Sequence, residues 1–453
     1  MANAKRVDFV WKTKNKWVFY LEFTILSEKD RISFGFEDEN NPNIPLFTKR
    51  FFLALDDSEI DSFNFLSFNY LQTMSTELLN RLRKEVSQFA ETNPSLNRVV
   101  AFLKRIPSGT HFYILPFTPS LEQLITYNIK LKVMNSHPKL NQEETVEFVN
   151  EEVQRVQSLI GHTIENFEII VANIGRKFRY GEFDRAKRIC RFCNGTTSTG
   201  VTFNSEAHLI PEGIGNKYAF NNEECDECNI NRFGPGIEKD FLEFFAFFRL
   251  FYRIRGKENF ETWKYRDARV STETGTISIT IQQNEIGEIE GKAPPETVSL
   301  QSFRPIKYMN LYRALAKFAI GLIPAKFLPD LSTTIDWING NQATATLPHI
   351  AICINTGIHF KNAQLTLYIR KETADKKLWP RVFVELHFGS IAIIFILPFF
   401  DVCEDQFITP SNFQDLLKRF RQYQGASWNY WDLNNDIEAK YEFQIDFQKN
   451  GDS

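Results

Sequence analysis

Residues 190–229 read CRFCNGTTSTGVTFNSEAHLIPEGIGNKYAFNNEECDECN, and this stretch decides what fold to expect around it. It holds four of the six cysteines of the 453-residue chain, arranged as two Cys-x-x-Cys pairs. Each pair places two thiolates on one tight turn, and two such turns can close a tetrahedral zinc site. The sequence therefore predicts a structural Zn²⁺ site made by Cys190, Cys193, Cys225 and Cys228.

The rest of the chain favours metal over disulfides at these cysteines. The N-terminal residues MANAKRVDFVWKTKNK contain no apolar signal-peptide core, and the longest apolar run, 391–400, is too short to span a bilayer. We expect a cytoplasmic protein without membrane contact, in which thiols stay reduced. Cys353 and Cys403 lie in apolar, strand-like runs and are expected to be core thiols.

Charge is distributed unevenly along the chain. The net charge is −3, which gives no nucleic-acid signal for the molecule as a whole. Basic residues nevertheless gather at 176–191 and 249–269, on either side of the cysteine segment. A local basic surface on a nearly neutral protein is what a phosphate-backbone partner requires, although an ordinary solvated surface has the same composition.

Between the two cysteine pairs lie residues suited to phosphodiester hydrolysis. Glu206 and His208 share a face if this segment is an extended strand. A carboxylate can hold a divalent metal while a neutral imidazole beside it activates water. Asn229 should begin a helix, where its amide oxygen can be a second metal ligand, and Asn221 or Asn222 could orient the imidazole.

The pattern CRFC…EAHLIPEGIGN…NNEECDECN…FG resembles the HNH endonuclease superfamily, whose members have a ββα-metal fold, in its zinc-bearing subtype. The resemblance continues through GIEKDFLEFFAFFRLFYRIRGK, residues 236–257. Similar segments occur in bacterial HNH proteins, including nuclease effectors of anti-phage defence. The resemblance implies DNA cleavage with Mg²⁺ or Mn²⁺, in defence against phage or other foreign DNA.

The resemblance also implies a role for each matching residue. His208 takes the place of the general base, Asn222 (failing that, Asn221) that of the asparagine holding the base, and Asn229 that of the last metal ligand. Many members have Asp or His directly before the base, where this chain has Ala207, so Glu206 is the nearest carboxylate for the metal. Contacts to the nucleic-acid backbone are expected from Arg188, Arg191, Lys217 and Arg232.

Hydrophobic periodicity predicts an α+β, multidomain chain, and the resemblance implies that its central part is the HNH domain. We expect a mixed α/β domain of sensory or regulatory role over 1–180, ending in a linker helix, then the HNH domain over 181–260 and an α+β domain over 261–453. Helices are expected at 74–91, 141–160, 236–254, 308–323 and 411–424, the last capped by Ser411, and strands at 16–26, 31–36, 111–117, 274–281, 364–370, 381–388 and 391–400; residues 284–296 read as a loop.

Two other functions stay open from the residues alone. A non-catalytic zinc-ribbon protein that binds nucleic acid or acts as a scaffold would have the same cysteines, and Ala207 favours it. HNH chemistry on RNA is the other. Beyond nucleic acid, the expected partners are an activating ligand or protein and a second copy of the chain.

Overall fold

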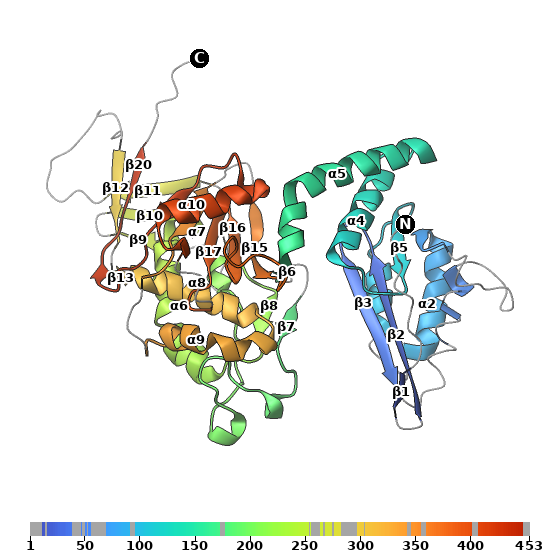
Figure 1. Cartoon of the computed structure of the whole chain (residues 1–453), viewed down its shortest axis with the longest axis horizontal. Helices are drawn as coiled ribbons and strands as arrows, with labels where there is room; N and C mark the ends of the chain where they lie inside the picture. The colour runs from blue at the N-terminus through green and yellow to red at the C-terminus, as the bar shows by residue number, and fades with distance from the viewer. Residues whose placement is uncertain are drawn as a thin grey trace, which may run out of the picture. The chain divides into compact units, whose positions relative to one another are not determined.

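The computed structural model describes residues 11–13, 16–38, 47, 50–51, 53–55, 69–90, 96–172, 177–252, 254, 263–265, 268–273, 276–281, 297–302, 304–341, 346–354, 359–400 and 406–446. The chain divides into two compact units, Met1–Leu159 and Ile160–Ser453 (Figure 1). The domain boundaries expected at 180/181 and 260/261 stay predictions. No described helix is long and apolar enough to cross a membrane.

The first unit contains a five-stranded antiparallel sheet and, among the described residues, three whole helices and most of a fourth, whose last residues belong to the second unit. The strand order is β1-β2-β5-β4, with β3 paired to β2. Helix α2 buries Leu78, Leu82 and Val86, the stripe that its apolar spacing predicts. The elements are β1 (Trp11–Thr13), β2 (Lys16–Leu26), β3 (Arg31–Asp38), β4 (Leu71–Thr73), α2 (Thr76–Ala90), α3 (Leu96–Leu103), β5 (His111–Leu115), α4 (Leu121–Ser136) and α5 (Gln142–Asn166).

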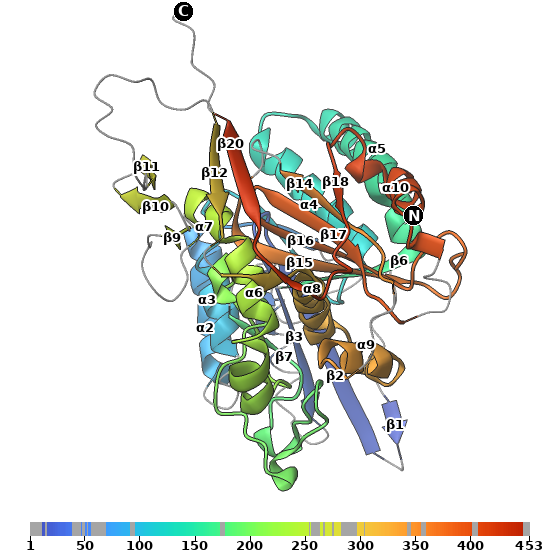
Figure 2. The same cartoon turned by 90° about the vertical axis from the view of Figure 1, so that its left-hand side faces the viewer.

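The second unit is built on a six-stranded antiparallel sheet, in the order β18-β14-β17-β16-β15-β6. Helix α8 packs on one face of this sheet and helix α10 on the other (Figure 2). The helices and sheet strands are α6 (Ile237–Phe244), α7 (Ala246–Phe251), α8 (Tyr308–Leu322), α9 (Ser332–Ile338), α10 (Pro410–Arg419), β6 (Phe167–Val171), β14 (Ile350–Ile354), β15 (Phe360–Arg370), β16 (Val382–Gly389), β17 (Ile391–Ile396) and β18 (Asn429–Trp431).

Short elements surround the sheet and carry the cysteine segment. Strands β7 and β8 pair in parallel, and the other short strands form three small antiparallel sheets. These elements are β7 (Phe178–Tyr180), η1 (Arg185–Lys187), η2 (Thr197–Thr199), η3 (Glu212–Ile214), β8 (Ala219–Asn221), η4 (Glu227–Phe233), β9 (Trp263–Lys264), β10 (Ala268–Glu273), β11 (Thr276–Ile281), β12 (Thr297–Gln301), β13 (Ile306–Lys307), η5 (Ala325–Leu331), η7 (Arg421–Tyr423), β19 (Glu438–Ala439) and β20 (Glu442–Asp446).

Helix α8 is the central element of the second unit. All but two of its residues are buried, so it is apolar nearly all round, as a helix covered on every side must be. One continuous core joins it to the sheet and to the cysteine segment, including Phe192 and Leu209. At Gly321 an added Cβ would lie 2.6 Å from Leu209 Cδ1, so glycine allows this close approach.

The expected helices and strands are present among the described residues, with four differences. The strand expected over 391–400 ends at Ile396, and the helix expected over 411–424 ends at Arg419. The apolar helix expected over 236–254 is interrupted at Phe245, where the backbone leaves the helical region between α6 and α7. The expectation that Ser411 caps the last helix is wrong, because Thr409 accepts the hydrogen bond from Asn412 N and Pro410 occupies the first turn. Cys353 is buried in β14, whereas Cys403 and the loop expected at 284–296 lie outside the described residues.

Candidate active site

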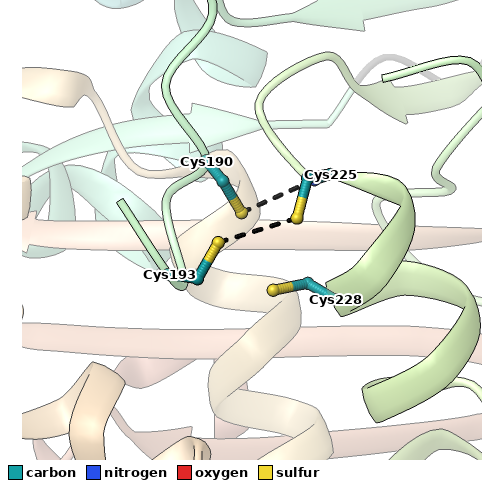
Figure 3. Close-up of side chains that lie close together, drawn as sticks. All are labelled: Cys190, Cys193, Cys225 and Cys228. Atoms are coloured by element: carbon teal, nitrogen blue, oxygen red, sulfur yellow. Dashed lines mark hydrogen bonds between the residues drawn. The ribbon is translucent and has the colours of Figure 1, made fainter. Parts of the chain in front are cut away.

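The four cysteines meet at one point (Figure 3). Their sulfur atoms all lie within 4.8 Å of one another, and Cys190, Cys225 and Cys228 are buried while Cys193 reaches the surface. A tetrahedral zinc with Zn–S bonds of about 2.3 Å would set its sulfurs about 3.8 Å apart. The chemistry and spacing of this donor set therefore fit a metal such as zinc.

Hydrogen bonds around the sulfurs favour thiolate at one of them. A hydrogen bond from Cys228, with backbone donors at Cys225 and Phe192, lowers the pKa of Cys190 to about 5. Burial raises the pKa of Cys225 to about 12. The backbone amide of Cys225 donates to Cys190 Sγ at 3.5 Å, as in a turn that presents sulfur to a cation.

A short hairpin positions His208. His208 and Phe220 form an antiparallel bridge, and on either side of it Leu209 N donates to Ala219 O and Asn221 N donates to Ala207 O. Strand β7 then pairs with β8 in parallel. The bridged segment at His208, strand β8 and the helical turn η4 follow one another along the chain.

Charged side chains cover the His208 face of this hairpin. The His208 ring lies 4.6 Å from the Phe220 ring, and Lys177 and Arg179 of the β7 region lie over the same Phe220 ring at 4.6 and 5.4 Å. Lys177 Nζ donates to both oxygens of Glu206, at 2.7 and 2.9 Å, and Arg179 donates to one of them. The Lys177 hydrogen bond and the two positive charges lower the pKa of Glu206 although burial opposes them.

A second carboxylate lies beside the imidazole. His208 Nε2 is 3.7 Å from Glu212 Oε2, and both side chains are about four-fifths buried, with 19% and 22% exposed. His208 Nδ1 lies deeper, within the hairpin. Nε2 is therefore the ring nitrogen on the carboxylate side.

Asn229 lies in the first turn of η4, next to the segment that carries Glu206. Its Nδ2 donates to Ser205 Oγ at 3.3 Å. Ser205 and Thr202 in turn donate to Asp226, and with the amides of Asn204 and Ser205 they lower the pKa of Asp226 to about 2 although burial opposes them. Asp226 thus fixes the loop between the first cysteine pair and the hairpin.

The two candidate asparagines differ in their bonding. Asn221 Oδ1 accepts from Glu223 N at 2.9 Å, and its Nδ2 points toward Gly321 of α8. Neither amide atom of Asn222 has a hydrogen-bond partner among the described residues, although Asn222 is 3% exposed. A buried amide of this kind is costly unless a partner is supplied, so Asn222 is the better candidate for contact with a reacting group.

The expected phosphate-binding residues fall into two groups. Arg191 is buried; it donates to Glu223 Oε2 at 2.7 Å and to the carbonyl oxygens of Ile320 and Ile323 at the end of α8. Arg188 is buried as well and donates to the carbonyl oxygens of Glu182 and Phe183. Neither arginine presents its charge to solvent, which does not fit the expected backbone contacts. Lys217 and Arg232 are exposed.

A buried ionic cluster lies between the second cysteine pair and α8. Lys317 Nζ is 2.9 Å from Glu224 Oε2 and 2.7 Å from Glu238 Oε1, with the lysine and Glu224 fully buried. Burial raises the pKa of Glu224 to about 7, whereas the two carboxylates outweigh burial at Lys317 and raise its pKa. This cluster ties the cysteine segment to α8 and was not foreseen from the sequence.

Residues 190–245 match a family described as HNH endonuclease. The chain carries an HNH endonuclease domain. The match includes all four cysteines, the His208 hairpin, Asn229 and the whole of α6. No curated protein and no solved structure matches the chain. The HNH assignment rests on this segment and its geometry.

Three residues of the HNH site were missed by sequence reasoning. Lys177 and Arg179 precede the matched segment, and their signal is the alternation in KFRY, which puts two cations on one face of a strand. Glu212 follows His208 by four residues, after a proline that ends the extended segment. Glu212 lies beside the imidazole, and the two cations lie over the Phe220 ring next to it.

Proposed function

We propose that this protein is a metal-dependent HNH endonuclease that hydrolyses phosphodiester bonds in DNA. The observation that carries the proposal is the HNH family match, within which His208 lies on a hairpin beside carboxylates and cations. In the proposed reaction His208 Nε2 accepts the proton of the attacking water. Glu212, 3.7 Å away, holds the ring and stabilises its protonated form.

Glu206 and Asn229 are proposed to hold the catalytic Mg²⁺ or Mn²⁺. Carboxylate and amide oxygens are suitable ligands for these hard cations, and the Asn229 amide lies beside Ser205, next to Glu206. When bound, the cation would stabilise the charge that develops on the phosphate and on the leaving oxygen. Asn222, buried without an internal partner, is proposed to hold the base in position.

The salt bridges of Glu206 suggest how DNA binding would make this carboxylate available to the metal. Glu206 is neutralised by Lys177 and Arg179, so both cations are proposed to move away when it becomes a metal ligand. A DNA phosphate is the natural acceptor for the two cations, since Arg and Lys bind phosphate strongly. Lys217 and Arg232 are proposed to extend this contact along the backbone.

The cysteine cluster is proposed to hold a structural zinc. It closes the loop that carries the hairpin, and its four donors leave no open position for substrate. The proposed biological role, action against phage or other foreign DNA, rests on the resemblance to defence nucleases. An activating ligand or partner protein belongs to the same proposal.

Plasmid cleavage by the purified full-length protein tests the proposal. We expect nicking or linearisation with Mg²⁺ or Mn²⁺, and a loss of at least about 100-fold in His208→Ala. His162→Ala is the matched control, because His162 is half-exposed on α5, outside the HNH segment, and its loss should leave cleavage unchanged. Zinc content and circular dichroism are compared in all three proteins.

Each alternative has its own outcome in this assay. Cleavage of an RNA but not of the plasmid would replace DNA by RNA as the substrate. Full activity in His208→Ala would show that the base is elsewhere. Zinc content of one per chain, with no cleavage of either nucleic acid under any metal or in the presence of infected-cell extract, would favour the non-catalytic scaffold.

A further inference from the structure

A cavity lies in the second unit, outside the residues of the HNH segment. It has a volume of about 210 Å³ and opens on the α10 face of the six-stranded sheet. Strands β14, β16 and β17 make its floor, and the segment from η7 to Trp428 closes one side. Its principal lining residues are Cys353, Phe360, Glu385, His387, Tyr423 and Trp428.

A buried carboxylate lies at the floor of this cavity. Glu385 has 13% of its side chain exposed. Its Oε2 accepts hydrogen bonds from Tyr368 Oη at 2.7 Å and Tyr423 Oη at 2.8 Å, and its Oε1 contacts His387 Nε2. Burial alone would raise the pKa of Glu385, but the bonds from His387 and the tyrosines outweigh it and lower the pKa. The group is therefore ionised at neutral pH.

The register of the sheet explains why these polar groups share a face. Along β16, Phe383, Glu385 and His387 alternate with residues that pack into the α8 core, such as Leu386. Glu385 is flanked across the sheet by Ile394 of β17. Burying an ionised carboxylate among apolar neighbours is less favourable than burying an apolar side chain of similar size. A fold could fill this position more stably with leucine, which indicates another use for the charge.

The walls of the cavity are aromatic. The Phe360 ring stacks on His387, with centroids 4.4 Å apart and planes 30° apart. Tyr423 and Trp428 meet edge to face at 5.6 Å, and Trp428 Nε1 donates to Tyr423 O, which fixes the indole. A small cavity with aromatic walls and one fixed acceptor suits a planar ring bearing N–H donors.

We propose that this cavity binds a small aromatic heterocycle of nucleobase size, whose N–H groups donate to Glu385 and whose ring packs against Trp428. Oε1 of Glu385 has capacity for a further donor, since a carboxylate oxygen accepts two hydrogen bonds. Gln422 and Ser390 on the lining offer further polar atoms to the ring substituents. The site is independent of the proposed nuclease function and does not require it.

Binding to the full-length protein tests the site, with adenine, guanine, cytosine and uracil as probes and choline as a cation probe. Calorimetry and tryptophan fluorescence report binding. We expect at least one base to bind with a Kd at or below about 1 mM, since a fixed charge-assisted hydrogen bond and one stacked ring suffice for that affinity. Glu385→Gln keeps the shape of the side chain and should weaken binding at least about tenfold.

A second variant keeps the test decisive if Glu385→Gln folds poorly. Ala392 lies on the floor of the cavity, and Ala392→Phe would fill the space without removing the carboxylate. This variant should abolish binding, whereas Asp415→Asn, on the exposed side of α10, should leave it unchanged. The proposal is overturned if no base binds at about 10 mM, a concentration far above the expected Kd. Binding of choline alone, or base binding that survives Ala392→Phe, would overturn it too.

Discussion

Glu206 and Glu385 are two carboxylates in one unit whose pKa values are lowered in different ways. Glu206 is about half exposed and is held by Lys177 and Arg179 on the surface of the HNH hairpin. Glu385 is mostly buried and is held by His387, Tyr368 and Tyr423 on the floor of a cavity. The first cluster can exchange its partners with solvent, metal or phosphate, whereas the second is fixed by packing.

The difference follows from how each backbone is supported. The Glu206 hairpin has only an isolated bridge and a three-residue strand, so the cysteine cluster and α8 must hold it in place. Strand β16, which carries Glu385, is paired along its length on both sides by β15 and β17. The proposed site for chemistry is thus built on a loop-like segment, and the proposed site for recognition on a rigid sheet.

Removal of the proposed zinc should have the largest effect, and it should destabilise the cysteine segment but not the six-stranded sheet. Structural zinc sites of this kind contribute about 10 kcal/mol or more of apparent binding free energy. We expect a strong chelator, or Cys228→Ser, to abolish amide-exchange protection over residues 190–229 while 382–396 stays protected. Hydrogen exchange followed by mass spectrometry measures both segments in one sample. Equal loss in the two segments would show that the sheet depends on the cysteine cluster.

Alanine substitutions should then separate the two carboxylates. Glu385→Ala leaves two tyrosine hydroxyls and an imidazole buried without their acceptor, at a cost of about 3 kcal/mol. Glu206→Ala removes only exposed ion pairs and should change stability by less than about 1 kcal/mol. Urea unfolding monitored by tryptophan fluorescence gives both values. Similar costs for the two variants would refute the contrast between a fixed and an exchangeable cluster.

At low pH the native protein should lose the stability that Glu385 gives it relative to the Glu385→Gln variant. The folded-state pKa of Glu385 lies below its unfolded value, so the stabilisation is complete above the ordinary carboxyl pKa and is lost as pH falls through the folded pKa. The stability difference between the native protein and Glu385→Gln should be constant between about pH 5 and 7 and shrink below that range. A difference that instead grows on acidification would mean that the pKa of Glu385 is raised.

A change in salt concentration should have the smallest effect, and it should change the pKa of Glu206 but not that of Glu385. Exposed ion pairs are screened at about 1 M salt, where the Debye length is about 3 Å, so the lowered pKa of Glu206 should return toward its ordinary value. The pKa of Glu385 should not move, because its partners are buried with it. Carboxyl carbon NMR at low and high NaCl follows both groups. An unchanged Glu206 would indicate that its hydrogen bonds, rather than the charges, lower its pKa.

Local patterns predicted most of the elements and the cysteine cluster. The strand over 16–26 was clear from its strand-typical composition and the helix over 308–323 from its long run of helix-favouring apolar residues. Cys-x-x-Cys spacing is nearly sufficient for a shared metal. The break at Phe245 escaped prediction, because the phenylalanines on both sides keep helical spacing through it. Tertiary packing, which no local window contains, decides where such a helix bends.

The candidate site was predicted less completely for the same reason. His208, Asn229 and the cysteines lie in one segment, whereas the partners of Arg191 and Glu224 come from α8. A basic residue beside a cysteine knuckle looks like a phosphate ligand until the carbonyl oxygens it binds are known. Glu385 was absent from the expected site residues because a Glu in an apolar strand has no motif around it.

The contacts of helix α8 with the HNH segment bear on how the two stretches of sequence are inherited. Arg191 of the HNH segment donates to carbonyl oxygens at the end of this helix. Lys317 of the helix balances the charges of Glu224 and Glu238 of the segment, so each side contributes half of this charge balance. A recombination event that copied residues 190–245 into another gene would leave buried charges without partners. We therefore expect the two stretches to pass together through lineages, and a change at Lys317 to be accompanied by loss of one of the two glutamates.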